Sequence, residues 1–290
     1  MPKLVWFNGT VSPMETAMVP AADHAHLYGD GIFEGIRFYR RHVFKLNEHL
    51  DRLYHGVRFL NYEMPYGKAE LRAIILDVCR QTDFTDGYIR LNLTRGTGLG
   101  LDPKSIDRRA NVMVMVSTIS LYPEEAYVNG LDVVTCSTRV IPADSLEPRL
   151  KCIGRYAANI LAKMEANSRG AGEGLMLNQH GELAECTGDN IFVIQNGAIR
   201  TPPASAGILQ GITRDTVIGL AQDAGYAMQE AVLTPFDLAT ADEAFLTGTA
   251  AEVIPMVTID GRLIGEGRPG PITRDLMSHF RALTGQGDAF

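Results

Sequence analysis

Strand-like and helix-like patterns follow one another irregularly along this chain of 290 residues, and this order most narrows the folds open to it. The dipeptides Asn196-Gly197 and Asp260-Gly261 each separate two apolar runs, where they predict tight hairpins between antiparallel strands. Helical patterns at 156–169 and 213–224 intervene without the strict strand–helix repeat of a doubly wound sheet. The sequence therefore predicts an α+β fold with mixed or antiparallel sheets and flanking helices.

The length suits two domains, and a change of composition indicates where they meet. Between Ser120 and Asn129 the sequence turns to Pro, Glu and Tyr and loses its regular patterning. We expect an interdomain linker at residues 120–130. It would join a small N-terminal α+β domain, residues 1–119, to a larger C-terminal α+β domain, residues 131–290.

The first part of the chain has the clearest local patterns. A helix is expected from about Asn47, a good cap residue. A second helix follows, with one face formed by Leu71, Ile74, Ile75 and Val78. The stretch 88–95 alternates as a strand does, so that Tyr88 and Arg90 share one face and the apolar residues the other. The continuous apolar run 111–119 predicts a buried strand.

Charge and cysteine content exclude several classes of partner. With a formal net charge of −7, the chain has no basic field for a nucleic-acid backbone or an anionic membrane. No apolar run approaches the roughly 20 residues that cross a bilayer. The start lacks the pattern of a secretory signal, and the four cysteines form no Cys-x-x-Cys pair. We expect a cytoplasmic, reduced protein without nucleic-acid, membrane or metal partners.

Two local motifs resemble binding sites but have better explanations. Gly96–Gly100 lacks the third glycine of a dinucleotide loop, and Asp102-Pro103 stands where a helix should begin, so this segment predicts a turn. His24-x-His26 has no matching pair of metal ligands nearby. Hydrogen-bonded structural or surface histidines are expected there.

The region from Leu150 to Glu252 holds the residues best suited to chemistry. Lys151, one of only six lysines, stands between Leu150 and Cys152, just before an expected helix. These neighbours indicate partial burial, and burial lowers the pKa of a lysine, as a Schiff-base lysine requires. Tyr156 lies five residues further on, about one turn into that helix. By this pattern alone, an ordinary solvated surface lysine stays open.

Three further segments combine groups that a site would need. Glu185–Phe192 places a carboxylate and a polar turn between expected strands, although a solvated hairpin would have the same pattern. Gly207–Arg214 runs into a helix whose first amides and Thr213 hydroxyl suit a phosphate. An ordinary capped helix is the alternative, since Ile272–Asp275 repeats the residues Ile-Thr-Arg-Asp. Small residues at 247–251 let backbone amides approach a ligand closely.

In their order and spacing, these blocks resemble the signature of the class IV pyridoxal-phosphate aminotransferases. The signature is matched by Glu185, Asn190–Phe192, Thr201 and Gly211–Arg214. Further blocks agree with it, namely Tyr28–Arg37, Asn47–Leu53, Tyr88–Arg90 and Thr247–Glu252. The resemblance covers about Phe7 to Leu283. It implies the two-domain fold type IV, similar to D-amino-acid aminotransferases, with most of the cofactor site in the C-terminal domain.

The resemblance also implies a role for each cofactor residue. Lys151 would form the Schiff base with pyridoxal 5'-phosphate and afterwards move a proton between the substrate Cα and C4′ of the cofactor. Tyr156 would bond to O3′, and Glu185 would keep the pyridine nitrogen protonated. The phosphate would be bound by Arg52 and by the helix start and the small-residue turn, that is, by Gly211, Ile212, Thr213, Gly248 and Thr249.

Within the class, the chain most resembles the branched-chain L-amino-acid aminotransferases, which exchange amino groups between Leu, Ile or Val and 2-oxoglutarate. Phe33–Arg37, Tyr88–Arg90 and Gly98–Pro103 carry this resemblance. By resemblance, the side-chain pocket would be lined by Tyr28, Phe33 and Tyr88. Arg90 would bind the carboxylate of glutamate, and further substrate contacts are expected from Arg37, Thr249 and Ala250. The resemblance also implies a homodimer or a higher homo-oligomer that acts on small-molecule amino acids and 2-keto acids.

Related functions stay open on the same scaffold. Arg155 stands where this subgroup has a small or polar neutral residue, so it either faces solvent or alters the choice of substrate. A D-amino-acid or (R)-selective amine transaminase is the second reading. The D-specific subgroup has an Arg-x-His pair, and Asn92 occupies the His position after Arg90. An aminodeoxychorismate lyase ranks third. A non-catalytic cofactor-binding protein would not need Lys151, Tyr156 and Glu185 together.

Overall fold

The computed structural model describes residues 3–290, which form two compact units. Unit 1 contains the described residues up to Ile119 together with Leu150–Arg155 and Thr284–Phe290. Unit 2 contains Ser120–Arg149 and Tyr156–Leu283. Two short segments that we expected in the C-terminal domain therefore pack with the N-terminal part of the chain. The domain limits proposed from the sequence stay a prediction.

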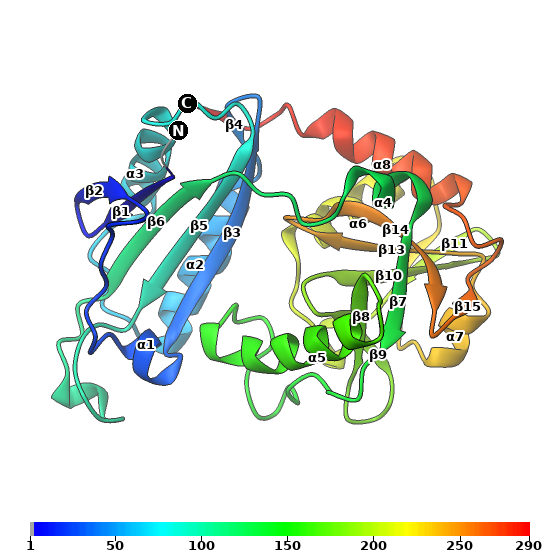
Figure 1. The fold of residues 1–290 in the computed structure, drawn as a ribbon, viewed down its shortest axis with the longest axis horizontal. Helices are drawn as coiled ribbons and strands as arrows, with labels where there is room; N and C mark the ends of the chain where they lie inside the picture. The colour runs from blue at the N-terminus through cyan, green and yellow to red at the C-terminus, as the bar shows by residue number, and fades with distance from the viewer. Residues whose placement is uncertain (1–2) are drawn as a thin grey trace. The chain divides into compact units, whose positions relative to one another are not determined.

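Unit 1 is built on a seven-stranded antiparallel sheet in the order β16-β4-β3-β5-β6-β1-β2 (Figure 1). Its strands are β1 (Leu4–Phe7), β2 (Thr10–Pro13), β3 (Gly31–Tyr39), β4 (His42–Val43), β5 (Gly87–Thr94), β6 (Asn111–Ser117) and β16 (Asp288–Ala289). The long strands β3 and β5 pair from Gly31 opposite Thr94 to Phe38 opposite Gly87. This register decides which of their side chains share a face.

Two long helices cover the core face of this sheet (Figure 1). The helical segments of unit 1 are α1 (His24–Tyr28), α2 (Leu46–Leu60), α3 (Lys68–Arg80) and the 3₁₀ turns η1 (Pro103–Ser105) and η2 (Ile153–Arg155). The expected helix that carries Leu71 and Val78 is confirmed as α3. Asn47 is not the cap of α2, because the helix begins earlier. Lys45, at φ 56°, turns the chain out of β4 and takes the cap position.

The buried strand expected at 111–119 is present as β6, Asn111–Ser117, but only one of its faces is buried. Val112, Val114 and Val116 are 0% exposed and belong to the core, whereas Met113 and Met115 are half-buried. Because both alternations of this strand are apolar, hydrophobicity could not separate the two faces. The alternation predicted for β5 is confirmed, with its apolar residues on the core face.

Unit 2 is built on a nine-stranded mixed sheet in the order β12-β11-β10-β13-β14-β7-β8-β9, with β15 beside β14 and a further pairing of β9 with β10. Its strands are β7 (Leu131–Thr135), β8 (Glu173–Leu177), β9 (Leu183–Cys186), β10 (Asn190–Gln195), β11 (Ala198–Thr201), β12 (Met228–Glu230), β13 (Glu243–Gly248), β14 (Glu252–Ile259) and β15 (Arg262–Leu263). Both predicted hairpin turns are confirmed, since Asn196-Gly197 and Asp260-Gly261 have positive φ at each residue. The predicted fold class is confirmed.

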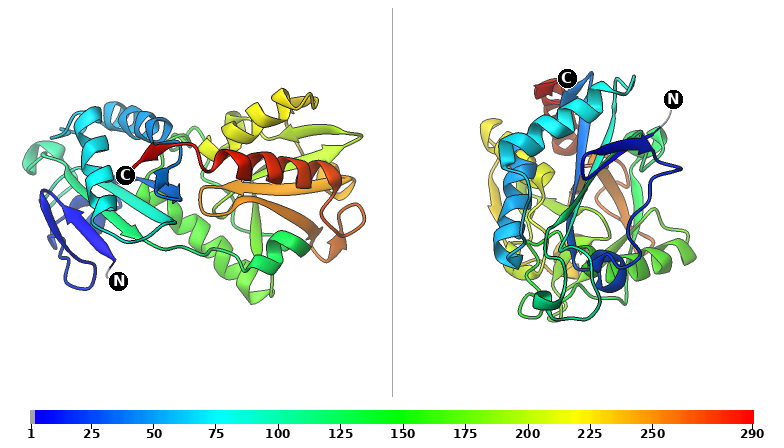
Figure 2. Two further views of the ribbon diagram at one scale, coloured as in Figure 1. Left: turned by 90° about the horizontal axis from the view of Figure 1, so that it is seen from above. Right: turned by 90° about the vertical axis from the view of Figure 1, so that its left-hand side faces the viewer.

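Helices pack on both sides of the sheet of unit 2. They are α4 (Glu124–Asn129), α5 (Tyr156–Ser168), α6 (Ile212–Asp223), α7 (Pro235–Ala239), α8 (Pro271–Leu283) and the 3₁₀ turn η3 (Ala204–Ala206). In β8, Leu175 faces one core cluster, and Met176 faces another together with Ala162 of α5. The helices α6 and α8 pack against each other and against β13 (Figure 2).

The segment that we expected to be irregular, 120–129, contains the helix α4. Its start has the signals of a helix N-terminus that we did not use, because Glu124 and Glu125 lie in the first turn, after Pro123. Within the described part of the chain, no helix has the length and apolar character needed to cross a membrane.

Candidate active site

Lys151 lies in a short segment of unit 1 that is hydrogen-bonded to β3. Its carbonyl oxygen accepts a bond from the Phe33 N–H at 3.0 Å, and the next residue, Cys152, bridges to Ile32. The Lys151 Nζ lies 4.7 Å from the centre of the Phe33 ring. The backbone therefore fixes Lys151 beside Phe33. Lys151 is half-buried, as its neighbours in the sequence indicated.

The register of β3 against β5 brings candidate substrate residues onto one face of the sheet. The opposed pairs are Phe33 with Asn92, Gly35 with Arg90, and Arg37 with Tyr88. The Arg90 guanidinium carbon lies 3.3 Å from the centre of the Phe33 ring, and Arg90 Nε donates to Asn92 Oδ1 at 2.8 Å. A Cβ at Gly35 would lie 2.1 Å from the Tyr88 hydroxyl, so glycine leaves the room that this hydroxyl needs. Tyr88 and Arg90 share a face, as predicted.

Arg37 lies next to Tyr39, which is two residues further along the same strand. Its guanidinium carbon lies 4.9 Å from the centre of the Tyr39 ring. This cation–π contact holds the long side chain against the sheet.

Arg52, on α2, is held by a buried carboxylate on the core side of β3. Its Nε and Nη2 donate to the two oxygens of Glu34 at 2.8 and 2.7 Å, and His49 Nδ1 lies 2.7 Å from Glu34 Oε2. Burial would raise the pKa of Glu34, but the charge of Arg52 and the hydrogen bonds from Arg52 and His49 lower the pKa to about 2. We did not predict Glu34. An acidic residue inside an otherwise apolar strand was the signal that could have revealed it.

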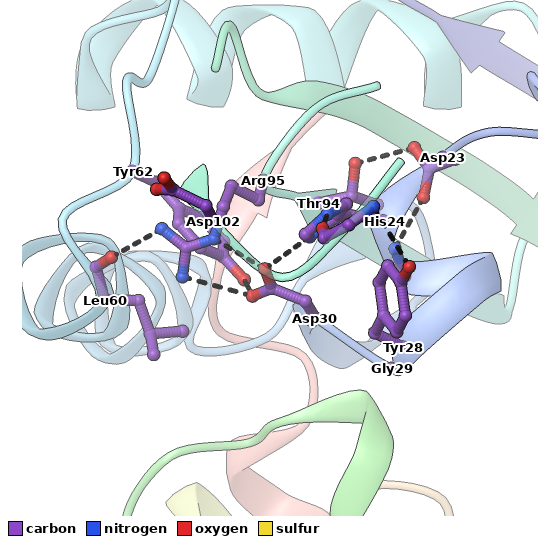
Figure 3. Close-up of polar contacts among 12 residues, drawn as sticks. Asp23, His24, Tyr28, Gly29, Asp30, Leu60, Tyr62, Thr94, Arg95 and Asp102 are labelled. Atoms are coloured by element: carbon purple, nitrogen blue, oxygen red, sulfur yellow. Dashed lines mark hydrogen bonds and ion pairs between the residues drawn. The ribbon is translucent and has the colours of Figure 1, made fainter. Parts of the chain in front are cut away.

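Tyr28 ends α1 in a cluster of polar residues of unit 1 (Figure 3). Its hydroxyl accepts a bond from the Gly100 N–H at 3.1 Å. His24 Nδ1 lies 2.9 Å from Asp30 Oδ2, so the structural role expected for this histidine is confirmed. The described residues contain no group of His, Cys, Asp and Glu suited to hold a metal ion. The segment 96–100 is an irregular loop with bends at Leu99 and Gly100, in which Thr97 bridges to Asp23 and Asp107, and not a regular turn.

Glu185 lies near the end of β9 and is only 6% exposed, which excludes the solvated hairpin considered for this segment. Its Oε2 accepts a bond from the Leu209 N–H at 2.8 Å. Asn190 donates from Nδ2 to the Leu209 carbonyl, also at 2.8 Å. Residues of β9 and β10 therefore hold the loop that leads into α6. A Cβ at Gly211 would lie 2.2 Å from Asn190 Oδ1, so this close approach requires glycine.

The residues Ile-Thr-Arg-Asp begin α6 and, in α8, follow its first residue Pro271, but the two N-termini differ. At α8, the N–H groups of Ile272 and Thr273 donate to the Glu243 carboxylate at 3.2 and 2.8 Å, and the Thr273 hydroxyl donates to it at 2.7 Å. At α6, no described residue accepts a hydrogen bond from the Ile212 N–H, the Thr213 N–H or the Thr213 hydroxyl. The N-terminus of α6 thus presents donors without acceptors, which is the arrangement that binds anions.

The turn between β13 and β14 contains Gly248, Thr249 and Ala250. A Cβ at Gly248 would lie 2.0 Å from Asp189 Oδ1, so the backbone of β13 passes directly over the turn between β9 and β10. The Thr247 hydroxyl is buried and has no hydrogen-bond partner among the described residues. This region therefore keeps small residues and an unpaired hydroxyl together, as a binding surface does.

A buried polar network anchors the same β9–β10 turn, and we did not predict it. The Tyr122 hydroxyl lies 2.9 Å from Glu173 Oε2 and 3.0 Å from Asp189 Oδ2. The Thr187 N–H and hydroxyl donate to Glu173 Oε1 at 3.1 and 2.5 Å. These partners lie far apart in sequence, so no local pattern pointed to them.

Two neighbouring residues mark the start of α5. Tyr156 is its first residue and is half-buried. Arg155, which ends η2, is 4% exposed, so the possibility that it faces solvent is wrong.

The chain matches a known protein family over most of its length. The model of this family, described as "Amino-transferase class IV", matches residues 31–259. The chain belongs to the class IV aminotransferase family. A protein of Methanocaldococcus jannaschii is 42% identical to this aminotransferase over 280 residues, which cover 96% of each chain. The branched-chain-amino-acid aminotransferase of Escherichia coli strain K12 is 35% identical over 285 residues, covering 96% of this chain and 92% of its own.

A solved structure shows the same fold as this class IV aminotransferase. It is the crystal structure of the branched-chain amino acid aminotransferase from Thermobaculum terrenum in its pyridoxal-phosphate form. The TM-score is 0.86 at 33% sequence identity, and the match covers 98% of this chain and 94% of the other. The fold type inferred from the sequence is thereby confirmed.

Proposed function

We propose that this class IV aminotransferase binds pyridoxal 5'-phosphate and transfers amino groups between branched-chain L-amino acids and 2-oxoglutarate. The N-terminus of α6 carries the cofactor assignment, because its two amides and the Thr213 hydroxyl lack acceptors among the described residues. A phosphate dianion supplies such acceptors. The substrate class follows from the Escherichia coli and Thermobaculum terrenum proteins, which are both named branched-chain aminotransferases.

Each unit presents residues that suit this cofactor. In unit 1, Arg52 would bind the phosphate, and in unit 2, Gly211, Ile212, Thr213, Gly248 and Thr249 would do so. The guanidinium of Arg52 is already oriented by its two hydrogen bonds to Glu34. Glu185 has one oxygen fixed by the Leu209 N–H, which suits a carboxylate that must meet a ring nitrogen in a set direction.

Bound pyridoxal phosphate supplies an electron sink for the bond that breaks at the substrate Cα. Lys151 would hold the cofactor through its amine and, once the amine of the substrate has taken its place, would act as the general base that takes the proton from Cα. Glu185 would keep a proton on the pyridine nitrogen, and Tyr156 would donate a hydrogen bond to O3′. These three roles explain why a lysine, a phenol and a buried carboxylate are all needed.

The substrate would contact one face of the β3–β5 sheet. Phe33, Tyr88 and Tyr28 would line an apolar pocket for a branched side chain. Arg90 would bind the second carboxylate of 2-oxoglutarate, with its Nε held by Asn92. Further contacts would come from Arg37, Thr249 and Ala250. We also propose that the protein is a cytoplasmic homodimer.

The test is a steady-state assay of the enzyme loaded with pyridoxal phosphate. L-leucine, L-isoleucine and L-valine with 2-oxoglutarate should be good substrates, and D-alanine and (R)-amines poor ones. Lys151→Ala should abolish turnover, whereas Lys3→Ala, which changes an exposed lysine just before β1, should retain it. Preference for D-alanine would overturn the proposed substrate class, and wild-type turnover by Lys151→Ala would overturn the mechanism.

A further inference from the structure

His24 and the loop at 96–100, two features that the proposed function does not use, meet in unit 1 (Figure 3). His24 is 2% exposed. Its Nε2 lies 2.9 Å from the Gly100 carbonyl oxygen, and its Nδ1 lies 2.9 Å from Asp30 Oδ2. The Gly100 N–H in turn donates to the Tyr28 hydroxyl at 3.1 Å. The Tyr28 ring stands edge-on to His24, with 4.9 Å between the ring centres. These contacts join His24, Gly100 and Tyr28 in one closed network.

Asp30, which contacts Nδ1 of His24, is the anchor of this network because several groups hold its carboxylate. Arg95 donates to both of its oxygens at 2.5 and 3.2 Å, and the Tyr62 hydroxyl donates to Oδ1 at 2.8 Å. Arg95 is itself tied to the Leu60 carbonyl at 3.0 Å. Burial would raise the pKa of Asp30, but the hydrogen bonds from Arg95, His24 and Tyr62 outweigh burial and lower it. Asp30 is therefore a carboxylate that accepts hydrogen bonds only.

Both ring nitrogens of His24 have an acceptor within hydrogen-bond distance, the Asp30 carboxylate at Nδ1 and the Gly100 carbonyl oxygen at Nε2. The neighbouring Asp23 carboxylate is engaged elsewhere, by the Ala25 N–H, Thr94 and Asn111. His24 therefore bridges the backbone at Gly100 and the carboxylate of Asp30.

We infer that His24 is a positioning residue, which ties the loop at 99–101 to Asp30 and thereby sets the position of the Tyr28 hydroxyl. This inference rests on the proposed function, in which Tyr28 lines the side-chain pocket. Tyr28 is 45% exposed, so few other contacts hold its ring in place. Leu99 and Leu101, which flank Gly100, are exposed by 73% and 78%. His24 would therefore affect substrate binding without touching the reacting atoms.

The variants that separate its two bonds are His24→Asn and His24→Gln. The Asn amide can replace Nδ1 toward Asp30 but is too short for Gly100, whereas the Gln amide can reach Gly100 as Nε2 does. His26→Gln is the matched control, since His26 is on the same helix and exposed. Amide hydrogen exchange at 99–101 in the holoenzyme should rise about tenfold in His24→Asn, less in His24→Gln and not in His26→Gln.

Kinetics provide the second measurement. His24→Asn should raise KM for L-leucine about threefold or more while kcat stays close to wild type, because ground-state binding is affected and the chemistry is not. Unchanged exchange at 99–101 in His24→Asn, or a loss of kcat at constant KM, would each overturn the inference.

The exchange measurement needs no substrate, so it separates this inference from the proposed function. An anchored loop in an enzyme that ignores L-leucine would contradict the substrate and leave the anchor standing. If His24→Asn fails to fold, Tyr28→Phe tests the same network, because it removes the acceptor of the Gly100 N–H. Protection of Gly100 equal to wild type in Tyr28→Phe would then overturn the inference.

Discussion

Arg52 is oriented within unit 1 by Glu34, which accepts two of its N–H groups from the core side of β3. The side chain is long and flexible, so fixing it in advance removes part of the entropy that ligand binding would cost. His49 holds the other side of the same carboxylate. At the scale of single residues, the phosphate-binding role that we propose for Arg52 would therefore depend on a buried group that does not itself contact the phosphate.

The first prediction concerns the affinity for pyridoxal phosphate. Glu34→Gln removes one charge-assisted bond to Arg52, and such a bond contributes about 1.5–3 kcal/mol. We expect the affinity to fall roughly tenfold or more, measured by titrating the apoenzyme and following cofactor absorbance. Glu48→Gln changes an exposed residue of α2, the helix that carries Arg52, and should bind pyridoxal phosphate as the wild type does. Equal affinities in Glu34→Gln and wild type would show that Glu34 does not orient Arg52.

The second prediction concerns stability in acid. The pKa of Glu34 is lowered from 4.5 to about 2, so its contribution is complete above pH 4.5 and is lost as the pH falls toward 2. A shift of this size corresponds to roughly 3 kcal/mol. Burial also lowers the pKa of His49, so its protonation in the unfolded chain acts in the same direction below about pH 6.5.

Denaturant unfolding of wild type and Glu34→Gln over this range measures the effect. The difference in free energy of unfolding between the two proteins should shrink as the pH falls from 4.5 to 2. A difference that stays constant would mean that the Glu34 carboxyl titrates near its usual pKa in the folded state.

At the scale of elements, α6 and α8 provide an internal comparison. Both carry Ile-Thr-Arg-Asp in the first turns, yet the amides of α8 are bonded to the Glu243 carboxylate and those of α6 have no such acceptor among the described residues. The same local sequence therefore serves folding in one place and, we propose, ligand binding in the other. The difference lies in the neighbouring strand β13, which carries Glu243 to α8.

The third prediction uses this pair. Thr273→Val removes a buried bond to Glu243 and should lower the free energy of unfolding by about 1–3 kcal/mol, with little effect on cofactor affinity. Thr213→Val should have the opposite pattern of effects. It should lower the affinity for pyridoxal phosphate about tenfold and change the free energy of unfolding of the apoprotein little. Denaturant unfolding and cofactor titration of both variants decide the matter. If both lose stability and neither loses affinity, α6 is an ordinary capped helix.

Local patterns predicted the elements better than the contacts between them. The hairpins at Asn196-Gly197 and Asp260-Gly261 were predictable because the turn type depends on two adjacent residues. The one-sided burial of β6 was not, because both of its faces are apolar. Glu34 and Tyr122 were missed for another reason: their roles depend on partners brought close only by tertiary packing. Family resemblance supplied most candidate residues, such as Arg52, that no spacing would have selected.

At the scale of the whole molecule, unit 1 is assembled from three separate stretches of chain. The segment at 150–155 bonds to β3 through the Lys151 carbonyl, and β16 adds to the sheet edge at β4. Phe290 packs edge-on against Phe38, with ring centres 5.1 Å apart. The first 119 residues therefore contain most of the sheet without two of the segments that complete it.

The fourth prediction follows from this assembly. A fragment of residues 1–119 should be markedly less stable than unit 1 in the intact chain, because its edge strand and the pairing of β3 with 150–155 are lost. Denaturant unfolding followed by tryptophan fluorescence reports on this unit, since Trp6 belongs to its core. A fragment as stable as the same unit in the intact chain would show that the later segments add nothing to its folding.

The measurement that tests the central claim most directly is the absorbance of the purified protein with pyridoxal phosphate, before and after L-leucine is added without a keto acid. We predict a visible cofactor band that disappears with L-leucine and returns with 2-oxoglutarate, and no stable band in Lys151→Ala. A protein that takes up no pyridoxal phosphate would contradict the cofactor assignment. A band unmoved by L-leucine but lost with D-alanine would contradict the proposed substrate.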